Sequence, residues 1–166
     1  MKPTMKFALP LLAVVMLAGC GQDAAETAAE KIAKQHGIDM DIDSDGDEST
    51  VSMTGPDGSK VMVGQDLGLP SGFPDDVAMY PDIKIVSTST TPQGFMIHAQ
   101  STDSLDKVVA FYEDRMTSKG WTRDAAQVQA DTMQTMGFTK DDRRASVTVF
   151  AGDDTTTVQV ATMDGV

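Results

Sequence analysis

The sequence contains a single cysteine, so it can form neither an intramolecular disulfide nor a metal or redox site built from paired cysteines. It has only two histidines, and neither stands in the spacing typical of a catalytic triad or a metal-binding motif. The sequence also lacks a G-x-S-x-G motif, an H-E-x-x-H motif and a glycine-rich phosphate loop. We therefore expect that the protein is not an enzyme.

Basic residues are also scarce, and this limits the classes of partner. Lys and Arg together number 13 against 25 Asp and Glu, which gives a net charge of −12 and an isoelectric point near 4.3. Nucleic-acid binding needs a basic face, so we expect no nucleic-acid partner. The length of 166 residues, with 40% hydrophobic and 23% charged residues, indicates a globular chain of one domain or one domain with a small appendage.

Long hydrophobic runs are absent except at the N-terminus. Lys2 and Lys6 make this end positive, and an apolar run follows over residues 7–18. This run is too short to cross about 30 Å of hydrocarbon as a helix, so it is typical of a secretory signal peptide. We predict that residues 1–19 are such a peptide and are removed.

The end of this run reads Leu17-Ala18-Gly19-Cys20. It resembles the lipobox of bacterial lipoproteins, in which small residues directly precede an acceptor cysteine. The resemblance implies cleavage between Gly19 and Cys20 and lipidation of Cys20, whose acyl chains then hold the protein stably to a membrane. An ordinary secretory peptide with an incidental cysteine is the alternative.

The residue after Cys20 bears on where such a lipoprotein resides. It is Gly21, not the aspartate that retains many lipoproteins in the inner membrane. The resemblance therefore implies the periplasmic leaflet of the outer membrane, with the inner membrane and the cell surface as the other destinations. Removal of residues 1–19 leaves 11 basic and 25 acidic residues, a net charge of −14. This charge predicts that the body stands off anionic headgroups on its tether.

Two short segments follow the cysteine. Residues 20–37 are rich in alanine at near-helical spacing and end at Gly37, a typical residue just beyond a helix, so we predict a helical tether. Residues 38–66 alternate apolar and polar positions in short runs separated by turns, which predicts a small acidic β-meander of three strands. Such a meander buries too little to be stable alone, so it either packs on its neighbour or stays mobile.

The meander opens with a run of carboxylates. From Asp41 the sequence reads D-x-D-x-D-G, which places Asp41, Asp43 and Asp45 where a calcium loop has its first three ligands, and Asp47 follows. Position 12 of such a loop is Ser52 instead of glutamate, and strands are expected on both sides. Weak calcium binding by these four aspartates and a merely solvated acidic turn are both open, and we expect no other cofactor.

Residues 67–166 are predicted to form the main domain. The boundary segment, residues 67–81, holds three prolines and two glycines, and its apolar residues suggest that it is pinned against a core. The predicted strands are residues 83–89, 95–100, 131–140, 145–150 and 156–163, and the predicted helix is residues 104–119, while residues 124–130 are equally compatible with a helix. The order ββαβββ predicts an α+β fold, a two-layer sandwich of an antiparallel sheet packed by one helix.

The predicted helix has clear boundaries and a clear apolar side. Its apolar stripe consists of Leu105, Val108, Val109, Tyr112 and Met116. Asp103 is expected to cap the first turn. Gly120 is expected to end the helix, with Trp121 packing back on Met116 as in a Schellman motif.

Two phrases of the main domain resemble phrases found in many uncharacterised bacterial lipoproteins. One is L-P-x-G-F-P-x-D-V-x-x-Y-P from Leu69 to Pro81, and the other is S-L-x-x-V-V-x-F-Y from Ser104, ending at Gly120-Trp121. The resemblance covers residues 38–166. It implies a small periplasmic domain of helix-grip type and brings no catalytic residues with it.

Methionine is plentiful, and two groupings suit Cu(I). They are Met96 with His98, and Met133 with Met136. Methionine is also a deformable core filler, so packing is the competing interpretation. Phe111 lies just off the helix stripe, and we expect it to extend the core in preference to facing a partner.

These features lead to a functional hypothesis with alternatives. We expect a lipoprotein anchored by acyl chains on Cys20, acting as a non-catalytic binding or envelope-assembly module with another envelope protein as its partner. The first alternative is an inhibitor or immunity protein against a basic envelope-targeting toxin, since the negative charge would steer their association. The second is a weak calcium-binding lipoprotein.

Overall fold

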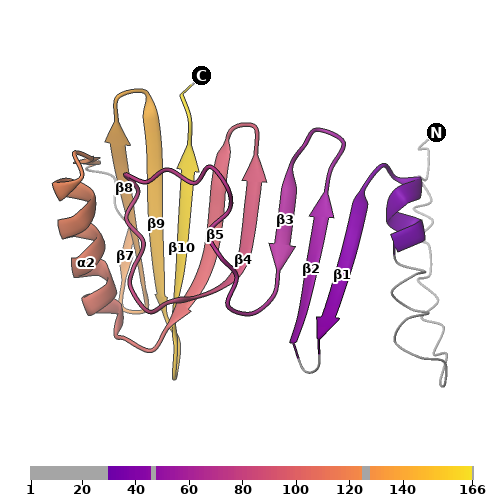
Figure 1. The fold of residues 1–166 in the computed structure, drawn as a ribbon. Helices are drawn as coiled ribbons and strands as arrows, with labels where there is room; N and C mark the ends of the chain where they lie inside the picture. The colour runs from indigo at the N-terminus through magenta and orange to yellow at the C-terminus, as the bar shows by residue number, and fades with distance from the viewer. Residues whose placement is uncertain (1–29, 46–47, 125–127, 166) are drawn as a thin grey trace, which may run out of the picture.

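The computed structural model describes residues 30–45, 48–124 and 128–165. They form one ten-stranded sheet with the order β1-β2-β3-β4-β5-β10-β9-β8-β6, all pairs antiparallel, with β7 paired to β8 (Figure 1). The elements are β1 (Asp39–Asp45), β2 (Glu48–Thr54), β3 (Lys60–Val63), β4 (Lys84–Thr91), β5 (Gly94–Ser101), α2 (Leu105–Ser118), β6 (Thr122–Arg123), β7 (Val128–Ala130), β8 (Met133–Lys140), β9 (Arg143–Ala151) and β10 (Thr156–Met163). The predicted α+β class, an antiparallel sheet with a helix packed on it, is confirmed.

The core lies between α2 and the half of the sheet that ends at β6. Helix α2 packs on β9, β8 and β6, and its stripe is buried as predicted, with Val108, Tyr112 and Met116 fully enclosed. The sheet supplies the opposing side chains, all without measurable exposure: Ile97, Met136, Val147, Val149, Val158 and Val160. The regular alternation of valine in β9 and β10 produces this face, because successive side chains of a strand point to opposite sides.

The boundary segment, residues 67–81, crosses the same side of the sheet as α2 (Figure 1). Val77, Ala78 and Tyr80 belong to the core, and Phe73 packs against it. The main-chain N–H of Tyr80 donates to the hydroxyl of Tyr112 at 3.2 Å. The expectation that this proline-rich segment is pinned against a core is therefore confirmed.

Helix α2 ends as its sequence predicts. Gly120 has φ 86°, a left-handed conformation that suits glycine. The N–H of Trp121 donates to the carbonyl of Met116 at 3.0 Å, and the N–H of Gly120 donates to that of Thr117 at 3.0 Å. These two hydrogen bonds define the Schellman motif.

The start of α2 differs from the prediction. Its N-cap is Ser104, and no side chain makes a capping hydrogen bond there, so Asp103 does not cap the helix. The carboxylate of Asp103 instead accepts hydrogen bonds from the Tyr80 hydroxyl at 2.6 Å and from Lys107 Nζ at 2.7 Å. A charge-assisted bond to an ammonium competes well with a main-chain N–H for the same oxygen atoms.

The N-terminal expectations fall only partly on described residues. Residues 30–35 are helical, and Gly37, with φ 74°, ends this helix through a hydrogen bond from the N–H of Ile38 to the carbonyl of Ala33 at 3.0 Å. Residues 1–29, which include the predicted signal peptide and the predicted cleavage and lipidation site at Gly19 and Cys20, lie outside the described part. Within the segment 124–130, which the sequence left open to a helix, residues 128–130 form a strand. Residues 125–127 lie outside the described part of the chain. No helix of the described residues is long and apolar enough to cross a membrane.

The meander joins the same sheet. Strand β3 pairs with β4 through four residue pairs, so β1 to β3 continue the sheet beyond the part that α2 covers (Figure 1). No described side chain of these three strands is fully buried. Among the described residues, the meander is therefore attached to the main sheet by the hydrogen-bonded pairing of β3 with β4, and no second layer buries its side chains.

Candidate functional site

The face of the sheet opposite α2, here called the open face, can be traced by register. Across β1 to β5, directly paired residues place Met40, Met53, Val61, Ser89 and Met96 in one row. The next row along the strands contains Ile97, which is buried in the same core cluster as Val108, Tyr112 and Met116 of α2. Since directly opposite residues of paired strands share a face, the first row lies on the side that α2 leaves uncovered.

Large apolar side chains are exposed on the open face. Val63 is 46% exposed, Met96 38%, Phe150 38% and Met163 56%. These four are the exposed large hydrophobics that the strands carry among the described residues, and register places all of them on this face. Scattered exposed apolar residues are ordinary, but their restriction to one face marks a contact surface.

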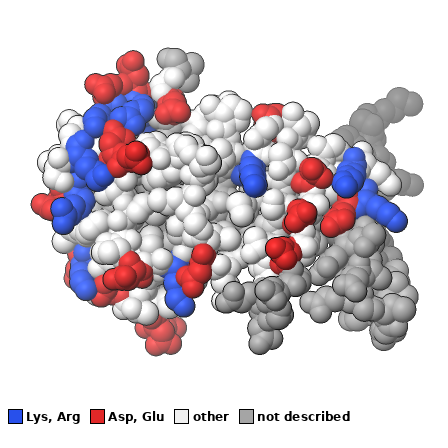
Figure 2. Space-filling model, in the orientation of Figure 1, with Lys and Arg blue, Asp and Glu red and all other residues white. Residues whose placement is uncertain are grey.

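The described strands carry no acidic side chain on the open face, although Asp142 and Asp164 lie beside Arg144 and Met163 at its edge. Its ionisable strand residues, within the described part of the chain, are Lys84, His98 and Arg144. The carboxylates of β1 lie on the opposite side, where Asp39, Asp41 and Asp43 alternate with the apolar positions. Figure 2 views the molecule from the side of α2, and acidic side chains gather there over the β1 end of the sheet. The described strands therefore carry their carboxylates on the side of α2 and not on the open face.

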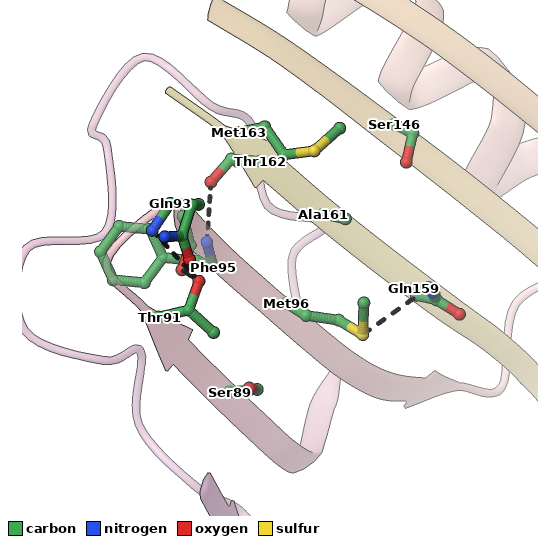
Figure 3. Close-up of a pocket in the computed structure, with 11 residues that line it drawn as sticks. Ser89, Thr91, Gln93, Phe95, Met96, Ser146, Gln159, Ala161, Thr162 and Met163 are labelled. Atoms are coloured by element: carbon green, nitrogen blue, oxygen red, sulfur yellow. Dashed lines mark hydrogen bonds between the residues drawn. The ribbon is translucent and has the colours of Figure 1, made fainter. Parts of the chain in front are cut away.

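A hollow of about 370 Å³ lies on the open face over β4, β5, β10 and β9 (Figure 3). Met96 from β5 and Met163 from β10 supply its exposed apolar surface, and Gln159 donates from Nε2 to the sulfur of Met96 at 3.8 Å. Its lining consists of Ser89, Thr91, Gln93, Gly94, Phe95, Met96, Ser146, Gln159, Ala161, Thr162 and Met163. Among the described residues, the lining contains hydroxyl groups but no histidine, carboxylate or lysine that would activate them as nucleophiles. The hollow therefore suits binding of an uncharged, largely apolar group.

Glycine at position 94 is required by the close approach of two strands beside the hollow. Gly94 has φ 150°, and a Cβ atom there would lie 2.0 Å from the carbonyl oxygen of Thr162. The neighbouring N–H of Phe95 donates to Oγ1 of Thr162 at 3.3 Å. The end of β5 is thus fixed against β10 at the rim of the hollow.

A second hollow, of about 420 Å³, lies on the other side of the molecule. It is lined by Ala78, Met79, Pro81, Phe111, Arg115 and Lys119. Phe111 packs edge-on against Tyr80, with ring centroids 4.9 Å apart, and its exposure is intermediate. Phe111 therefore extends the core as expected. The two cations that line this hollow are Arg115 and Lys119. Lys119 Nζ already donates a hydrogen bond to the carbonyl oxygen of Asp75 at 2.6 Å.

Three of the four predicted calcium ligands, Asp41, Asp43 and Asp45, lie in strand β1 and not in a coiled loop. Asp41 and Asp43 are exposed in β1 and pair with Ser52 and Thr50 of β2. Carboxylates two positions apart on a strand start from Cα atoms about 7 Å apart, whereas a calcium loop curls its ligands around one ion. The side chain of Asp45 and the whole of Asp47 lie outside the described part. No group of three or more His, Cys, Asp or Glu side chains gathers among the residues described.

The two groupings that suit Cu(I) differ in whether their side chains lie on the same face of a strand. Met133 and Met136 lie on opposite faces of β8, and Met136 is fully buried in the core, so these two residues cannot share an ion. Met96 and His98 share the open face of β5. A pair of ligands on one strand is compatible with packing as well as with metal binding.

The open face was missed by sequence reasoning. The alternation in residues 38–43 indicates a strand with one apolar side, but not that this side lies opposite the helix-covered core. The decisive signal is the pairing of Val61 with Ser89 and of Met62 with Thr88, because Thr88 is buried and pairs with the core residue Ile97. Such a register is set by tertiary pairing and is not visible in the local pattern.

Comparison with known proteins gives one match. Residues 82–162 match a protein-family model described as START domain-like. No curated protein and no solved structure matches the chain. The chain is thus similar to START domain-like proteins over β4, β5, α2 and the strands that follow to near the end of β10, the part that contains most of the core and most of the hollow beside Met96.

Proposed function

We propose that this protein is a lipoprotein anchored through Cys20 to the periplasmic side of the outer membrane. Its α+β domain acts there as a non-catalytic binding or envelope-assembly module. The contact surface is the open face, with the hollow at Met96 and Met163 as its centre. The observation that carries the proposal is the confinement of exposed apolar strand residues to a face that bears no acidic residue among the described strands.

The interior of the domain supports a contact on its outside. Tyr112 of α2 and Ile97, Val147 and Val160 of the sheet have no measurable exposure, so packed side chains fill the space between helix and sheet. A ligand of appreciable size would have to displace these residues. The open face offers apolar area without that cost.

The finer description of the fold belongs to this proposal. We assign β4, β5, α2, β8, β9 and β10 to a helix-grip-like, two-layer ββαβββ unit, to which β6 and β7 are short additions. The START domain-like match over residues 82–162 supports this assignment. The meander, residues 38–66, is an appendage that extends the sheet of this unit.

The anchor is tested by changing its acceptor residue. Cys20→Ser is expected to abolish incorporation of labelled palmitate and to leave a precursor that is not cleaved after Gly19. Thr54→Ser, which keeps the acceptor, serves as the control and should be labelled and processed normally. A Cys20→Ser protein that is still processed and tightly membrane-bound would refute the lipid anchor.

The contact surface is tested by capture from detergent-solubilised envelope. Met96→Glu places a charge in the hollow, while Thr54→Glu places one on the opposite side of the sheet. A stoichiometric component retained by the native protein and by Thr54→Glu, but lost with Met96→Glu, is the expected result. Recovery of only abundant, non-stoichiometric proteins, or equal capture by all three, would contradict a protein partner at this face.

The acidic side of β1 favours a second candidate, an inhibitor of a basic envelope-targeting toxin. Asp39, Asp41 and Asp43 present three exposed carboxylates in a row, which suits electrostatic steering of a cationic partner. This candidate requires that association with the basic partner weakens as the salt concentration rises and in the double variant Asp41→Asn, Asp43→Asn.

Calcium binding is tested by isothermal titration at 1 mM calcium. Because Asp41 and Asp43 lie along a strand, we expect neither binding heat nor a change in Tm.

A further inference from the structure

The charge of the mature chain is unevenly distributed across the sheet. The net charge of −14 predicts that the body as a whole is repelled by anionic headgroups. However, Asp39, Asp41 and Asp43 all lie on the side of α2, while Lys84 and Arg144 lie on the open face. The open face is thus the side on which the described strands present cations and no carboxylate, so an anionic surface repels it less than it repels the row of aspartates in β1.

We propose that the open face of the sheet lies against the surface of the lipid bilayer to which Cys20 anchors the chain. This inference rests on the proposed lipid anchor and names the partner of the contact surface as the bilayer itself. The exposed side chains of Val63, Met96 and Met163 then meet the boundary between headgroups and acyl chains. The cations at Lys84 and Arg144 meet lipid phosphates.

The extent of the face fits a surface better than a small ligand. The open face contains apolar residues from one end of the sheet almost to the other, from Met40 and Ile42 in β1 to Phe150 in β9. Neighbouring strands are about 4.8 Å apart, so the row across the seven strands from β1 to β9 spans roughly 29 Å. The hollow at Met96 accounts for only the part of this row between β4 and β9.

The anchor makes a weak contact sufficient. Eighteen residues separate Cys20 from Asp39, the first residue of β1, so the sheet cannot be held more than roughly 60 Å from the bilayer. Docking of the face is then an intramolecular step with a high effective concentration, and it does not need the affinity that a free protein would require. Met40 and Ile42, the first apolar positions of the sheet, follow directly on this tether.

A second copy of the chain fits the face less well. If two open faces packed together, each would offer Lys84, His98 and Arg144, and neither would offer a carboxylate from the described strands to pair with them. Like charges facing each other across an interface weaken association. An anionic bilayer supplies both the missing negative charge and the apolar layer.

The test uses the lipidated protein in vesicles of three parts phosphatidylethanolamine to one part phosphatidylglycerol. Lipidation consumes the thiol of Cys20, so an introduced cysteine is the only site for a fluorescent label. Val63→Cys labels the open face and Lys60→Cys the opposite side of the same strand; both positions are exposed. Quenching by nitroxide-labelled lipid is compared with quenching by iodide in solution.

We expect the label at position 63 to be quenched by nitroxide lipid at least twofold more than the label at position 60, and to be shielded from iodide. Equal, weak lipid quenching at both positions would overturn the inference in favour of a body that stands off the membrane. Shielding from iodide without lipid quenching at position 63 would overturn it in favour of a protein partner or a second copy. Protein that fails to float with the vesicles would refute the anchor itself and would thus be distinguishable from both.

Charge variants provide a second readout on the same vesicles. Lys84→Gln combined with Arg144→Gln is expected to reduce lipid quenching at position 63 by at least half, with an unchanged circular dichroism spectrum. Lys119→Gln, which removes a cation from the opposite side of the molecule, should leave the quenching unchanged. Equal losses in both variants would show a general effect of net charge and would contradict a specific orientation.

Discussion

At the scale of single residues, Asp76 ties the boundary segment to the sheet. Its two carboxylate oxygens accept hydrogen bonds from Nη1 and Nη2 of Arg143 at 2.9 and 2.6 Å, and Lys140 Nζ donates to Oδ2 at 2.8 Å. The Arg143 guanidinium lies 5.1 Å from the ring centre of Trp121, whose Nε1 donates to the carbonyl of Asp76 at 2.8 Å. These hydrogen bonds and the planar fit of guanidinium on carboxylate link the boundary segment to β8 and β9. The group of Asp76, Lys140 and Arg143 is here called the clasp.

The clasp predicts a pH-dependent contribution to stability. Hydrogen bonds from Arg143 hold the pKa of Asp76 well below its ordinary value. A carboxyl with a depressed pKa in the folded state stabilises the fold above its unfolded pKa of about 3.9, and the contribution is lost as pH falls below that value. Asp76→Asn should therefore lower the free energy of unfolding by about 1–3 kcal/mol at pH 7. The difference from the native protein should shrink below pH 4 in urea titrations.

The control for this prediction is the adjacent position. Asp75 is exposed, and the hydrogen bond that it accepts from Lys119 goes to its main-chain carbonyl. Asp75→Asn preserves that bond and should change the free energy of unfolding by less than about 0.5 kcal/mol. Equal losses in the two variants would mean that the ion pairs of Asp76 contribute nothing specific.

Gly94 gives a second prediction at this scale. Gly94→Ala should destabilise the protein by more than about 1 kcal/mol, because the new Cβ atom meets the backbone of Thr162 in β10. Gly68→Ala is the matched control, since a Cβ atom at Gly68 meets nothing within 4 Å. Thermal unfolding followed by circular dichroism compares the two. A Gly94→Ala protein as stable as Gly68→Ala would show that β5 and β10 separate there at little cost.

At the scale of elements, sequence reasoning succeeded where local signals act alone. The stripe of α2 and its ending at Gly120 follow from helical spacing and from a glycine with positive φ, and both are local. The predicted cap of α2 was wrong because the carboxylate of Asp103 is engaged by Lys107 and by Tyr80, a residue 23 positions earlier in the chain. The face on which the meander exposes its apolar residues likewise depends on the pairing of β3 with β4. Long-range partners therefore decided each feature that was missed.

The elements differ in burial, and this predicts unequal local stability. Strands β9 and β10 each hold side chains that are fully buried in the core cluster, whereas β1 to β3 hold none among their described residues. Local opening is easiest where few apolar contacts are lost. Amide hydrogen exchange of the unlipidated protein should therefore be fast in β1 to β3 and slowest in β9 and β10. Equal protection of both groups of strands would indicate that a further layer covers the meander.

At the scale of the whole molecule, the core is confined to the later part of the chain. All residues of the buried cluster fall between Val77 and Val160, although the sheet continues through β3 to β1. The match to the START domain-like family covers residues 82–162 and likewise leaves the meander outside. The sheet is thus continuous in hydrogen bonding but divided in burial, and the division falls near the proline-rich segment predicted as a boundary.

This division predicts that residues 67–166, preceded by an initiating methionine, fold without the meander. Urea unfolding followed by the fluorescence of Trp121, the only tryptophan, should stay cooperative, because the core cluster is retained in full. Removal of β3 uncovers the edge of β4, and unpaired edges promote association. Sedimentation should therefore show more self-association than in residues 38–166, and Ser87→Lys on β4 should reduce it. A broad, non-cooperative transition in the shortened protein would show that β1 to β3 are part of the folding unit, and the open face would then be a single rigid surface from β1 to β9.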